Sequence, residues 1–405
     1  MTSEEMAALM ACRVNGAVCP ILDDNDKIDD LNMAMSLGMI YRSAAAKCLT
    51  AVLGKESKDR LGFAFGLLVP ALLLASCAPV YKARFDMTAS GGIVWPGKPE
   101  KPRIKYLWSL HNLSGGEQEK DGVMDVVAGR SKDDAAGLQT SETLLRPQAV
   151  YADENRIYIA DPGAGKVSIL QRSTMDVLQI TEGRHGESLS YPRSVVADGS
   201  GTIYISDSEM KKVMAYRPDG KFLFDFGGEF LRPEGLAIDR GRNVLYIADT
   251  DAHLVYVYGT DGIKKGVIGR KGAGPGEFYY PTYTAVDKDG NVYVTDFLNF
   301  RVQKFSPEGR FLKAIGSLGD SYDTLDKPKG VAVDTEGHIY IVDGAKDMVK
   351  IFDQDGRLLL FFGEKGERYG DFYLPAGIFI DEKNIVYVAD MLNMRIQAFQ
   401  FLGGD

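Results

Sequence analysis

The chain has 405 residues, of which 45% are hydrophobic and 25% charged, and its net charge at pH 7 is −9. The acidic balance and the lack of any Lys/Arg block disfavour nucleic acid as a partner, because no surface for contacting phosphates is supplied. The four cysteines, Cys12, Cys19, Cys48 and Cys77, do not show the spacing of a metal site.

Residues 1–54 resemble neither a purification tag nor a second domain. We interpret them as an over-extended gene start, with a disordered or helical extension as the alternative. If translation begins near residue 52, Cys77 is the single cysteine of the mature protein, which excludes a disulfide framework.

Residues 55–77 have the pattern of a lipoprotein signal peptide. Basic residues precede an uncharged run over 61–76, which is short for a membrane span and has the length of a signal-peptide core. The run ends in Leu-Ala-Ser-Cys, which resembles the bacterial lipobox, so we expect lipidation of Cys77 and a membrane-anchored protein of the cell envelope. Ala78 favours the outer membrane, with the rest of the chain on its periplasmic or surface face. An ordinary signal peptide or a short helix is the alternative.

Residues 78–102 predict a tether, because 94–102 is Pro-rich and therefore extended and semi-rigid. Residues 114–141 are rich in Gly, Ser and charged residues and predict a loop, with space for a short helix at 121–129.

One phrase, hydrophobic-Tyr-hydrophobic-x-Asp, recurs six times at steps of 42 to 47 residues. It ends at Asp161, Asp207, Asp249, Asp296, Asp343 and Asp390. Each phrase predicts a strand, because it is β-branched, contains Tyr and closes on a turn-forming residue. Three further short strands per repeat can be recognised around it. Four antiparallel strands in a repeat of this length are typical of a β-propeller blade.

The sixth repeat ends after its third strand, and a matching strand lies at 103–110. We therefore expect residues 103–405 to form an all-β, six-bladed β-propeller whose four-stranded blades begin near 145, 190, 231, 279, 326 and 373. The strand at 103–110 is expected to complete the last blade, which closes the ring and removes free sheet edges.

The repeat resembles the NHL repeat. The resemblance is carried by Pro-x-Gly-hydrophobic-Ala-hydrophobic-Asp at 328–334, the phrase at 339–343, and Asn-x-Arg-Val-Gln-x-Phe at 299–305. It covers roughly residues 103–403 and implies the six-bladed fold. It implies little about function, because the family includes enzymes, RNA binders, sensor domains and protein-binding scaffolds.

The residues that keep the repeat symmetry are interpreted as structural. The six phrase-ending carboxylates would cap backbone N–H groups in turns rather than bind a cation. Asn299 and Arg301, repeated as Asn393 and Arg395, are expected to close turns and to bridge neighbouring blades.

Enzyme signatures are weak, and no catalytic residue, metal or cofactor is assigned. The resemblance includes amidating lyases with a central zinc held by histidines, but His111, His185, His253 and His338 occupy unlike repeat positions. The Gly-rich segment 272–278 lacks the Gly-Lys-Ser/Thr ending of a phosphate-binding loop, and no nucleophile elbow is present.

Departures from the repeat symmetry point to a ligand site. The residues after the Pro of each innermost strand are Gln148, Arg193, Glu234, Thr282, Lys329 and Ala376. They should surround the mouth of the central channel, and Tyr283 replaces the small residue that comes next in the other repeats. Mixed charge with a Tyr suits a polar ligand or peptide, so Gln148, Arg193, Glu234, Tyr283 and Lys329 are the candidate binding residues. Solvated loop positions are the alternative.

These observations favour a monomeric, lipid-anchored propeller that binds a protein, peptide or other envelope ligand through one face of the ring. The alternative is a metal-dependent lyase or hydrolase with its site at the channel mouth. Of the mouth residues only Glu234 is an obvious metal ligand, which counts against the enzyme.

Overall fold

The computed structural model describes residues 81–90, 92–113, 143–319 and 321–403. The N-terminal extension, the signal peptide with Cys77 and the segment 121–129 lie outside the described residues, so their assignments stay predictions. In the described ranges, no helix has the length and apolar character that a membrane span requires.

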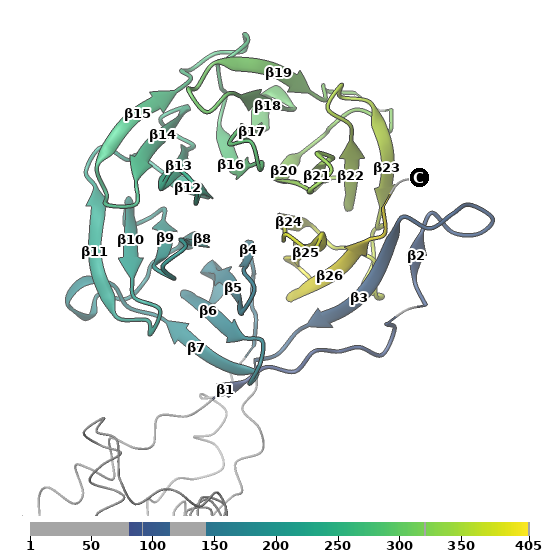
Figure 1. Cartoon of the computed structure of the whole chain (residues 1–405), viewed down its shortest axis with the longest axis horizontal. Helices are drawn as coiled ribbons and strands as arrows, with labels where there is room; N and C mark the ends of the chain where they lie inside the picture. The colour runs from purple at the N-terminus through teal and green to yellow at the C-terminus, as the bar shows by residue number, and fades with distance from the viewer. Residues whose placement is uncertain (1–80, 91, 114–142, 320, 404–405) are drawn as a thin grey trace, which may run out of the picture. The chain divides into compact units, whose positions relative to one another are not determined.

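The predicted six-bladed propeller is confirmed: six antiparallel sheets surround a central axis (Figure 1). The innermost strands are β4 (Ala149–Ala152), β8 (Pro192–Ala197), β12 (Pro233–Asp239), β16 (Pro281–Val286), β20 (Pro328–Val333) and β24 (Pro375–Ile380). The second strands are β5 (Arg156–Asp161), β9 (Ile203–Asp207), β13 (Val244–Asp249), β17 (Val292–Asp296), β21 (Ile339–Asp343) and β25 (Ile385–Asp390). The third strands are β6 (Lys166–Gln171), β10 (Lys212–Tyr216), β14 (Leu254–Gly259), β18 (Arg301–Phe305), β22 (Met348–Phe352) and β26 (Arg395–Phe401). The outer strands are β7 (Asp176–Ile180), β11 (Phe222–Gly227), β15 (Lys264–Ile268), β19 (Phe311–Ile315), β23 (Leu358–Phe362) and β3 (Ile104–Leu110).

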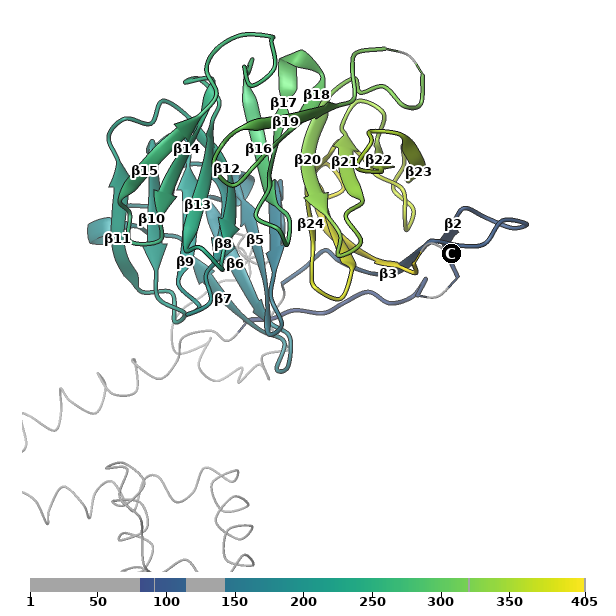
Figure 2. The same cartoon turned by 45° about the horizontal axis from the view of Figure 1, so that its top comes forward.

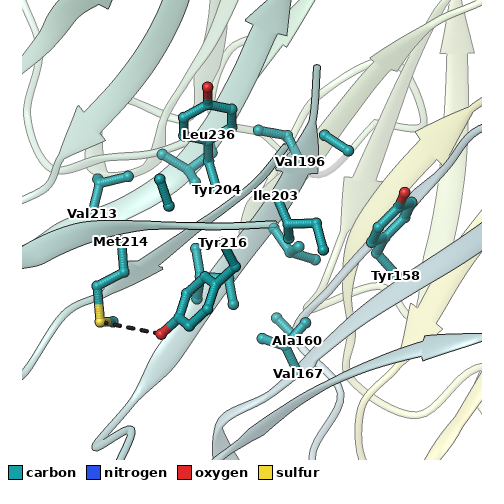
Figure 3. Close-up of a cluster of buried hydrophobic side chains, with 14 of the residues drawn as sticks. Tyr158, Ala160, Val167, Val196, Ile203, Tyr204, Val213, Met214, Tyr216 and Leu236 are labelled. Carbon is teal, nitrogen blue, oxygen red and sulfur yellow. Dashed lines mark hydrogen bonds between the residues drawn. The ribbon is translucent and has the colours of Figure 1, made fainter. Parts of the chain in front are cut away.

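The core lies between the blades and is centred on the second strands. Almost every residue of these strands is buried, because each sheet is covered on both faces by its neighbours. Figure 3 shows this packing, with Ile203 and Tyr204 of blade two in the same buried cluster as Tyr158 and Ala160 of blade one. The innermost strands contact one another around the whole ring, and they form the wall of the axial channel.

The ring closes as the sequence predicts. Strand β3 pairs antiparallel with β26, from Leu110 opposite Ile396 to Ile104 opposite Phe401. The outer strand of blade six therefore comes from the other end of the domain (Figure 2). This pairing supplies partners for a strand edge that would otherwise be free.

The segment predicted as a tether is, over residues 81–102, part of the propeller instead. Strand β1 (Tyr81–Lys82) adds a fifth strand beside β7, and β2 (Val94–Trp95) adds one beside β3. The Trp95 ring lies 5.7 Å from that of Phe362 and 5.8 Å from that of Phe399. Prolines remove backbone donors but do not prevent a large aromatic side chain from packing. The ring of Trp95 therefore holds this Pro-rich segment against the propeller.

Candidate functional site

In five of the six blades, the innermost strand begins beside the carboxylate that ends the second strand. In blade three Pro233 pairs with Asp249, and the register then shifts before Leu236 pairs with Ile247. The same shift occurs in blades two, four, five and six. A bulge of this kind redirects the side chains at its site. In these five blades the bulge includes the residue that follows the Pro.

These six residues, called the mouth from here on, are Gln148, Arg193, Glu234, Thr282, Lys329 and Ala376. Arg193 of blade two joins both of its neighbours. Its Nη1 donates to Gln148 Oε1 at 2.8 Å and its Nη2 donates to Glu234 Oε2 at 2.6 Å. The other carboxylate oxygen of Glu234 lies 3.0 Å from Arg232 Nε. The structure thus brings together the predicted residues of blades one to three, which form the closed half of the mouth.

The ion pair at the centre of the closed half is largely withdrawn from solvent. The side chains of Arg193 and Glu234 are 13% and 4% exposed. Burial lowers the pKa of the Arg193 guanidinium, but the adjacent Glu234 carboxylate outweighs it, and the pKa is raised above its ordinary value. Arg193 is therefore a fixed cation at the mouth.

Tyr283 spans the channel beneath the mouth. It belongs to blade four, and its hydroxyl donates to the main-chain oxygen of Gln148 in blade one, 3.2 Å away. Strands β16 and β4 face each other across the ring in Figure 1. Burial raises the pKa of Tyr283 to about 12, so the hydroxyl remains a donor at neutral pH.

The small residues at positions equivalent to Tyr283 have a steric cause. A Cβ at Gly235 would lie 2.5 Å from the main-chain oxygen of Thr282, and one at Gly330 would lie 2.6 Å from the nitrogen of Ile378. The innermost strands of neighbouring blades approach too closely there for a side chain. Tyr283 is the large exception that sequence comparison of the repeats identified.

Thr282, Lys329 and Ala376, from blades four to six, complete the mouth. Among the described residues, Lys329 Nζ has no hydrogen-bond or ion-pair partner. Burial, with a smaller contribution from nearby Arg193, lowers the pKa of Lys329 to about 8. The stem of Lys329 lies against Gly344, where a Cβ would come within 2.9 Å of Lys329 Cε.

Thr282 is the mouth residue whose importance the sequence did not indicate. Its Oγ1 is buried and has no hydrogen-bond partner in the part of the chain that the structure describes. A buried hydroxyl without a partner is costly. Its state depends on the strands around it, so no sequence signal reveals it.

Beyond the mouth, the innermost strands enclose a cavity of about 90 Å³. Its lining mixes apolar side chains, such as Val195 and Leu236, with polar ones, such as Ser194 and Thr284. Several water molecules fit in such a volume.

The repeated carboxylates have the structural role expected of them, and they also accept hydrogen bonds from the loop that precedes each blade. Asp207 accepts from the backbone of Ser190 and Tyr191, which precede blade two, as well as from Met210 in the following turn. Each such Asp fixes the loop by which the chain enters its blade. These carboxylates are engaged by the scaffold.

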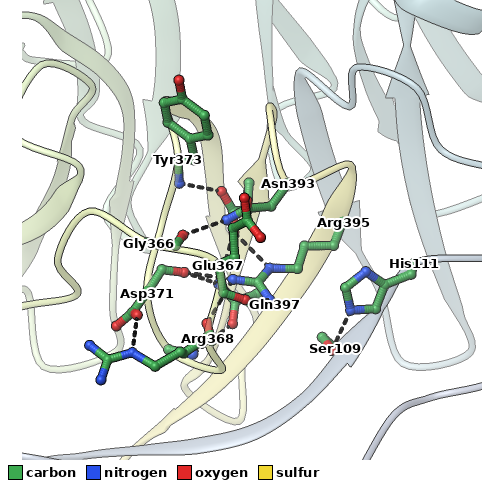
Figure 4. Close-up of polar contacts among 12 residues, drawn as sticks. Ser109, His111, Gly366, Glu367, Arg368, Asp371, Tyr373, Asn393, Arg395 and Gln397 are labelled. Atoms are coloured by element: carbon green, nitrogen blue, oxygen red, sulfur yellow. Dashed lines mark hydrogen bonds and ion pairs between the residues drawn. The ribbon is translucent and has the colours of Figure 1, made fainter.

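Arg395 extends the same network in blade six (Figure 4). It contacts Asp390 at 2.7 Å and donates to the main-chain oxygens of Glu367, Arg368 and Asp371 in the loop that enters the blade. Arg301 makes the equivalent contacts in blade four. Both arginines thus join the second strand of their blade to the loop that enters it.

The histidines have separate environments. His253 Nδ1 accepts from the backbone of Tyr280, His338 Nδ1 lies 2.9 Å from Asp334, and His111 contacts Ser109 at 3.1 Å. No group of three or more His, Cys, Asp or Glu side chains is placed to hold a metal within the described ranges.

Ser109 and His111 do not form a catalytic relay with Asp86. Ser109 is completely buried, and the Asp86 carboxylate accepts from Thr88 and Tyr369. A nucleophilic serine needs access to substrate and a base that a third group orients. The pair is part of the packing between strand β3 and the segment 81–90.

Comparison with known proteins supports the fold. Residues 237–329 match a family model described as a 6-bladed beta-propeller. The chain is 36% identical over 121 residues to peptidyl-glycine alpha-amidating monooxygenase A of Xenopus laevis, and 28% identical over 122 residues to protein brain tumor of Drosophila melanogaster. These matches cover 28% and 29% of this chain, but only 12% of either relative.

Among solved structures, an auxiliary nutrient binding protein from Bacteroides thetaiotaomicron superposes with a TM-score of 0.50 at 14% identity. The match covers 63% of this chain and 68% of that protein, and it shows a shared fold alone. With the family model and the two relatives, it confirms the similarity to NHL-repeat, six-bladed propellers.

Proposed function

We propose that the chain is a binding module that takes up a polar ligand, as part of a protein, a peptide or another envelope component, at the mouth of its channel. The propeller fold is consistent with a binding or scaffold module. The observation that carries the proposal is the convergence of Gln148, Arg193, Glu234, Tyr283 and Lys329 from five blades at one end of the axis.

Rigid support favours a binding role for the mouth. All five side chains project from the innermost strands or the residue just before one, and strand pairing fixes those backbones. A site whose polar groups are held by the scaffold binds without a large loss of conformational entropy. The position at one end of a ring axis also agrees with where concave ligand sites occur in closed β-structures.

The residues that break the repeat symmetry are also those that the scaffold uses least. The symmetric carboxylates and Arg395 make hydrogen bonds to loops, whereas Lys329 Nζ and Thr282 Oγ1 have no partner within the described ranges. Polar groups that a fold keeps buried at a cost, without using them, mark a functional position.

We further propose that a lipid on Cys77 anchors the propeller to the envelope membrane. The lipobox-like sequence and the apolar run before it support this. Cys77→Ser should abolish incorporation of labelled fatty acid into the chain and leave a longer precursor that keeps residues 55–76. Incorporation equal to that of the unaltered chain would overturn the anchor and leave the mouth proposal intact.

The binding proposal is tested with a charge-matched pair of triple variants. The mouth variant carries R193Q, E234Q and K329M. The control carries R217Q, D219N and K221M in an exposed turn where the same charge types meet. Both triples change the net charge equally.

Each protein is immobilised, incubated with solubilised envelope of the source cells, and its captured components are quantified by mass spectrometry. Components captured by the unaltered chain and the control, but depleted at least tenfold by the mouth variant, support the proposal. Equal capture by both triples refutes it, provided that circular dichroism shows both to be folded.

A further inference from the structure

We infer that the outer edge of blade five pairs with the same edge of a second copy of this chain, which forms a two-fold dimer through strand β23. This edge lies at the rim of the ring, whereas the mouth is built on the innermost strands (Figure 1). The dimer is therefore independent of the proposed binding function. It would replace the monomer that the sequence favours.

The rim of the propeller already accepts added strands. Strand β1 pairs with the outer strand of blade one and β2 with that of blade six, both in the antiparallel sense. Among the described residues, the outer strands β11, β15, β19 and β23 carry no further strand. Each of these four edges therefore has backbone N–H and C=O groups with which another strand can pair.

Strand β23 differs from the other three free edges because it contains no charged residue. Its sequence is Leu-Leu-Leu-Phe-Phe over 358–362. By contrast, β11 contains Asp225, β15 contains Lys264 and Lys265, and β19 has Lys313 at its centre. Charged side chains protect an edge from pairing, and self-pairing of β19 would place Lys313 opposite its own copy. Of these four edges, β23 lacks such protection.

The face of β23 that is turned away from the core is apolar. Leu359 and Phe361 are 43% and 37% exposed, whereas Leu360 between them packs against the core. The ring of Tyr322, which is 66% exposed, stacks on Phe361 with the ring centroids 4.9 Å apart. Strand addition at this edge would bury an exposed apolar stripe together with the free backbone groups.

A second copy matches this edge residue by residue. A two-fold axis at Leu360 pairs the two strands antiparallel, so that the same patch of each copy contacts the other. It places Leu359 of each copy opposite Phe361 of the other, and paired residues of an antiparallel ladder point to the same face. With the two Tyr322 rings stacked on the phenylalanines, six apolar side chains gather at the contact.

The charges at the two ends of β23 also complement those of a second copy. The turn before the strand carries Asp353, Asp355 and Arg357, and the loop after it carries Glu364, Lys365, Glu367 and Arg368. Antiparallel pairing brings the turn of one copy to the loop of the other, so Arg357 approaches Glu364 and Asp355 approaches Lys365. The side chains of Arg357 and Glu364 are 74% and 70% exposed, and the ion pairs they make within the chain lie at the surface, where such pairs contribute little.

The area of this contact predicts a reversible dimer. Stable interfaces bury roughly 1,200–2,000 Å² in total, and a five-residue strand with its neighbouring side chains lies at or below the lower end of that range. Association should therefore depend on protein concentration. The experiment must measure an equilibrium rather than rely on a complex that survives purification.

Full-length copies that carry a donor or an acceptor fluorophore on a C-terminal tag are mixed in excess detergent, and energy transfer is titrated with protein concentration. We expect saturable transfer for the unaltered chain. Leu359→Lys should weaken association about tenfold, because each ammonium would lie against Phe361 of the other copy. Leu312→Lys is the matched control: Leu312 has the equivalent position in β19, is 48% exposed, and gains the same charge. It should leave association unchanged.

Two charge reversals test the antiparallel register. Arg357→Glu and Glu364→Arg should each weaken self-association several-fold, because each dimer of one variant brings like charges together twice. A mixture of the Arg357→Glu donor with the Glu364→Arg acceptor should recover the affinity of the unaltered chain, since every contact again joins opposite charges. Shared detergent micelles or a general loss of stability would not produce this recovery.

Absence of transfer in the unaltered chain up to its highest soluble concentration would overturn the dimer. Equal transfer for Leu359→Lys and Leu312→Lys would overturn it as well, and so would a mixed pair that associates no better than either charge reversal alone. If an envelope protein bound this edge in place of the second copy, the edge would be a docking site for a foreign strand and the dimer would be wrong. The mouth triple should leave transfer unchanged, so the dimer and the binding proposal can fail separately.

Discussion

The hydroxyl of Tyr283 in blade four hydrogen-bonds the main-chain oxygen of Gln148 in blade one, which lies on the opposite side of the ring. This 3.2 Å contact ties two blades that share no strand pairing and are 135 residues apart in the chain. The Tyr283 side chain therefore crosses the axis of the ring from blade four to blade one.

Tyr283→Phe removes this bond and little else. We expect a loss of about 1 kcal/mol in the free energy of unfolding, because the Gln148 oxygen is left without this donor. Denaturant titration of the variant beside Tyr322→Phe, whose side chain is exposed, measures the difference. Identical midpoints for both variants would mean that the contact contributes nothing.

Lys329→Met should stabilise the protein at pH 7. The pKa of Lys329 is about 8 in the folded state, below the ordinary value of 10.5. Below pH 8 both states carry the proton and the cost of burying the charge is complete. Between about pH 8 and 10.5 the folded state has lost the proton that the unfolded state keeps, so the stability of the unaltered chain rises with pH.

The advantage of Lys329→Met, roughly 1–3 kcal/mol at pH 7, should therefore shrink across that pH interval. Unfolding by urea at pH 7, 8.5 and 10 checks this, with Lys221→Met as the exposed control. An advantage that does not vary with pH would show that packing, and not the ammonium, causes it.

Asp390→Asn should be among the most destabilising single changes. Asp390 is fully buried and its partner Arg395 is 2% exposed, so the variant leaves a buried guanidinium without its anion. We expect a cost of about 3–5 kcal/mol. Asp219→Asn, in an ion pair whose side chains are 43% and 57% exposed, should cost less than about 1 kcal/mol. Calorimetry of both variants provides the comparison.

Trp95→Ala tests whether residues 81–102 belong to the propeller. The loss of ring contacts with Phe362 and Phe399 should cost roughly 1–3 kcal/mol. Met87→Ala, at a residue that is 57% exposed in the same segment, should have little effect. A free tether predicts that neither substitution changes the melting temperature.

The repeat made the fold predictable to the level of individual blades. Six copies of one phrase gave the strands and their order, and the missing strand of the last copy required a partner at 103–110. The same alignment located the mouth, because Arg193, Glu234 and Lys329 differ at a position that the copies share.

What the repeat did not predict depends on contacts between distant segments. Composition marked 94–102 as extended, but the docking of Trp95 depends on Phe399, which lies 304 residues later. The isolation of Thr282 Oγ1 and the reach of Tyr283 to Gln148 likewise follow from how the blades meet around the axis. No local pattern encodes them.

The pairing of β1 with β7 leaves only a short segment between Cys77 and blade one. Tyr81 lies opposite Val177 at the rim of blade one, only four residues after Cys77. Four extended residues reach at most about 14 Å. If Cys77 carries a lipid, no more than this length of chain separates blade one from the lipid headgroups. A large partner would then have to bind on the side of the ring opposite blade one or along the propeller axis. A few residues inserted before Tyr81 would increase the distance between the propeller and the bilayer.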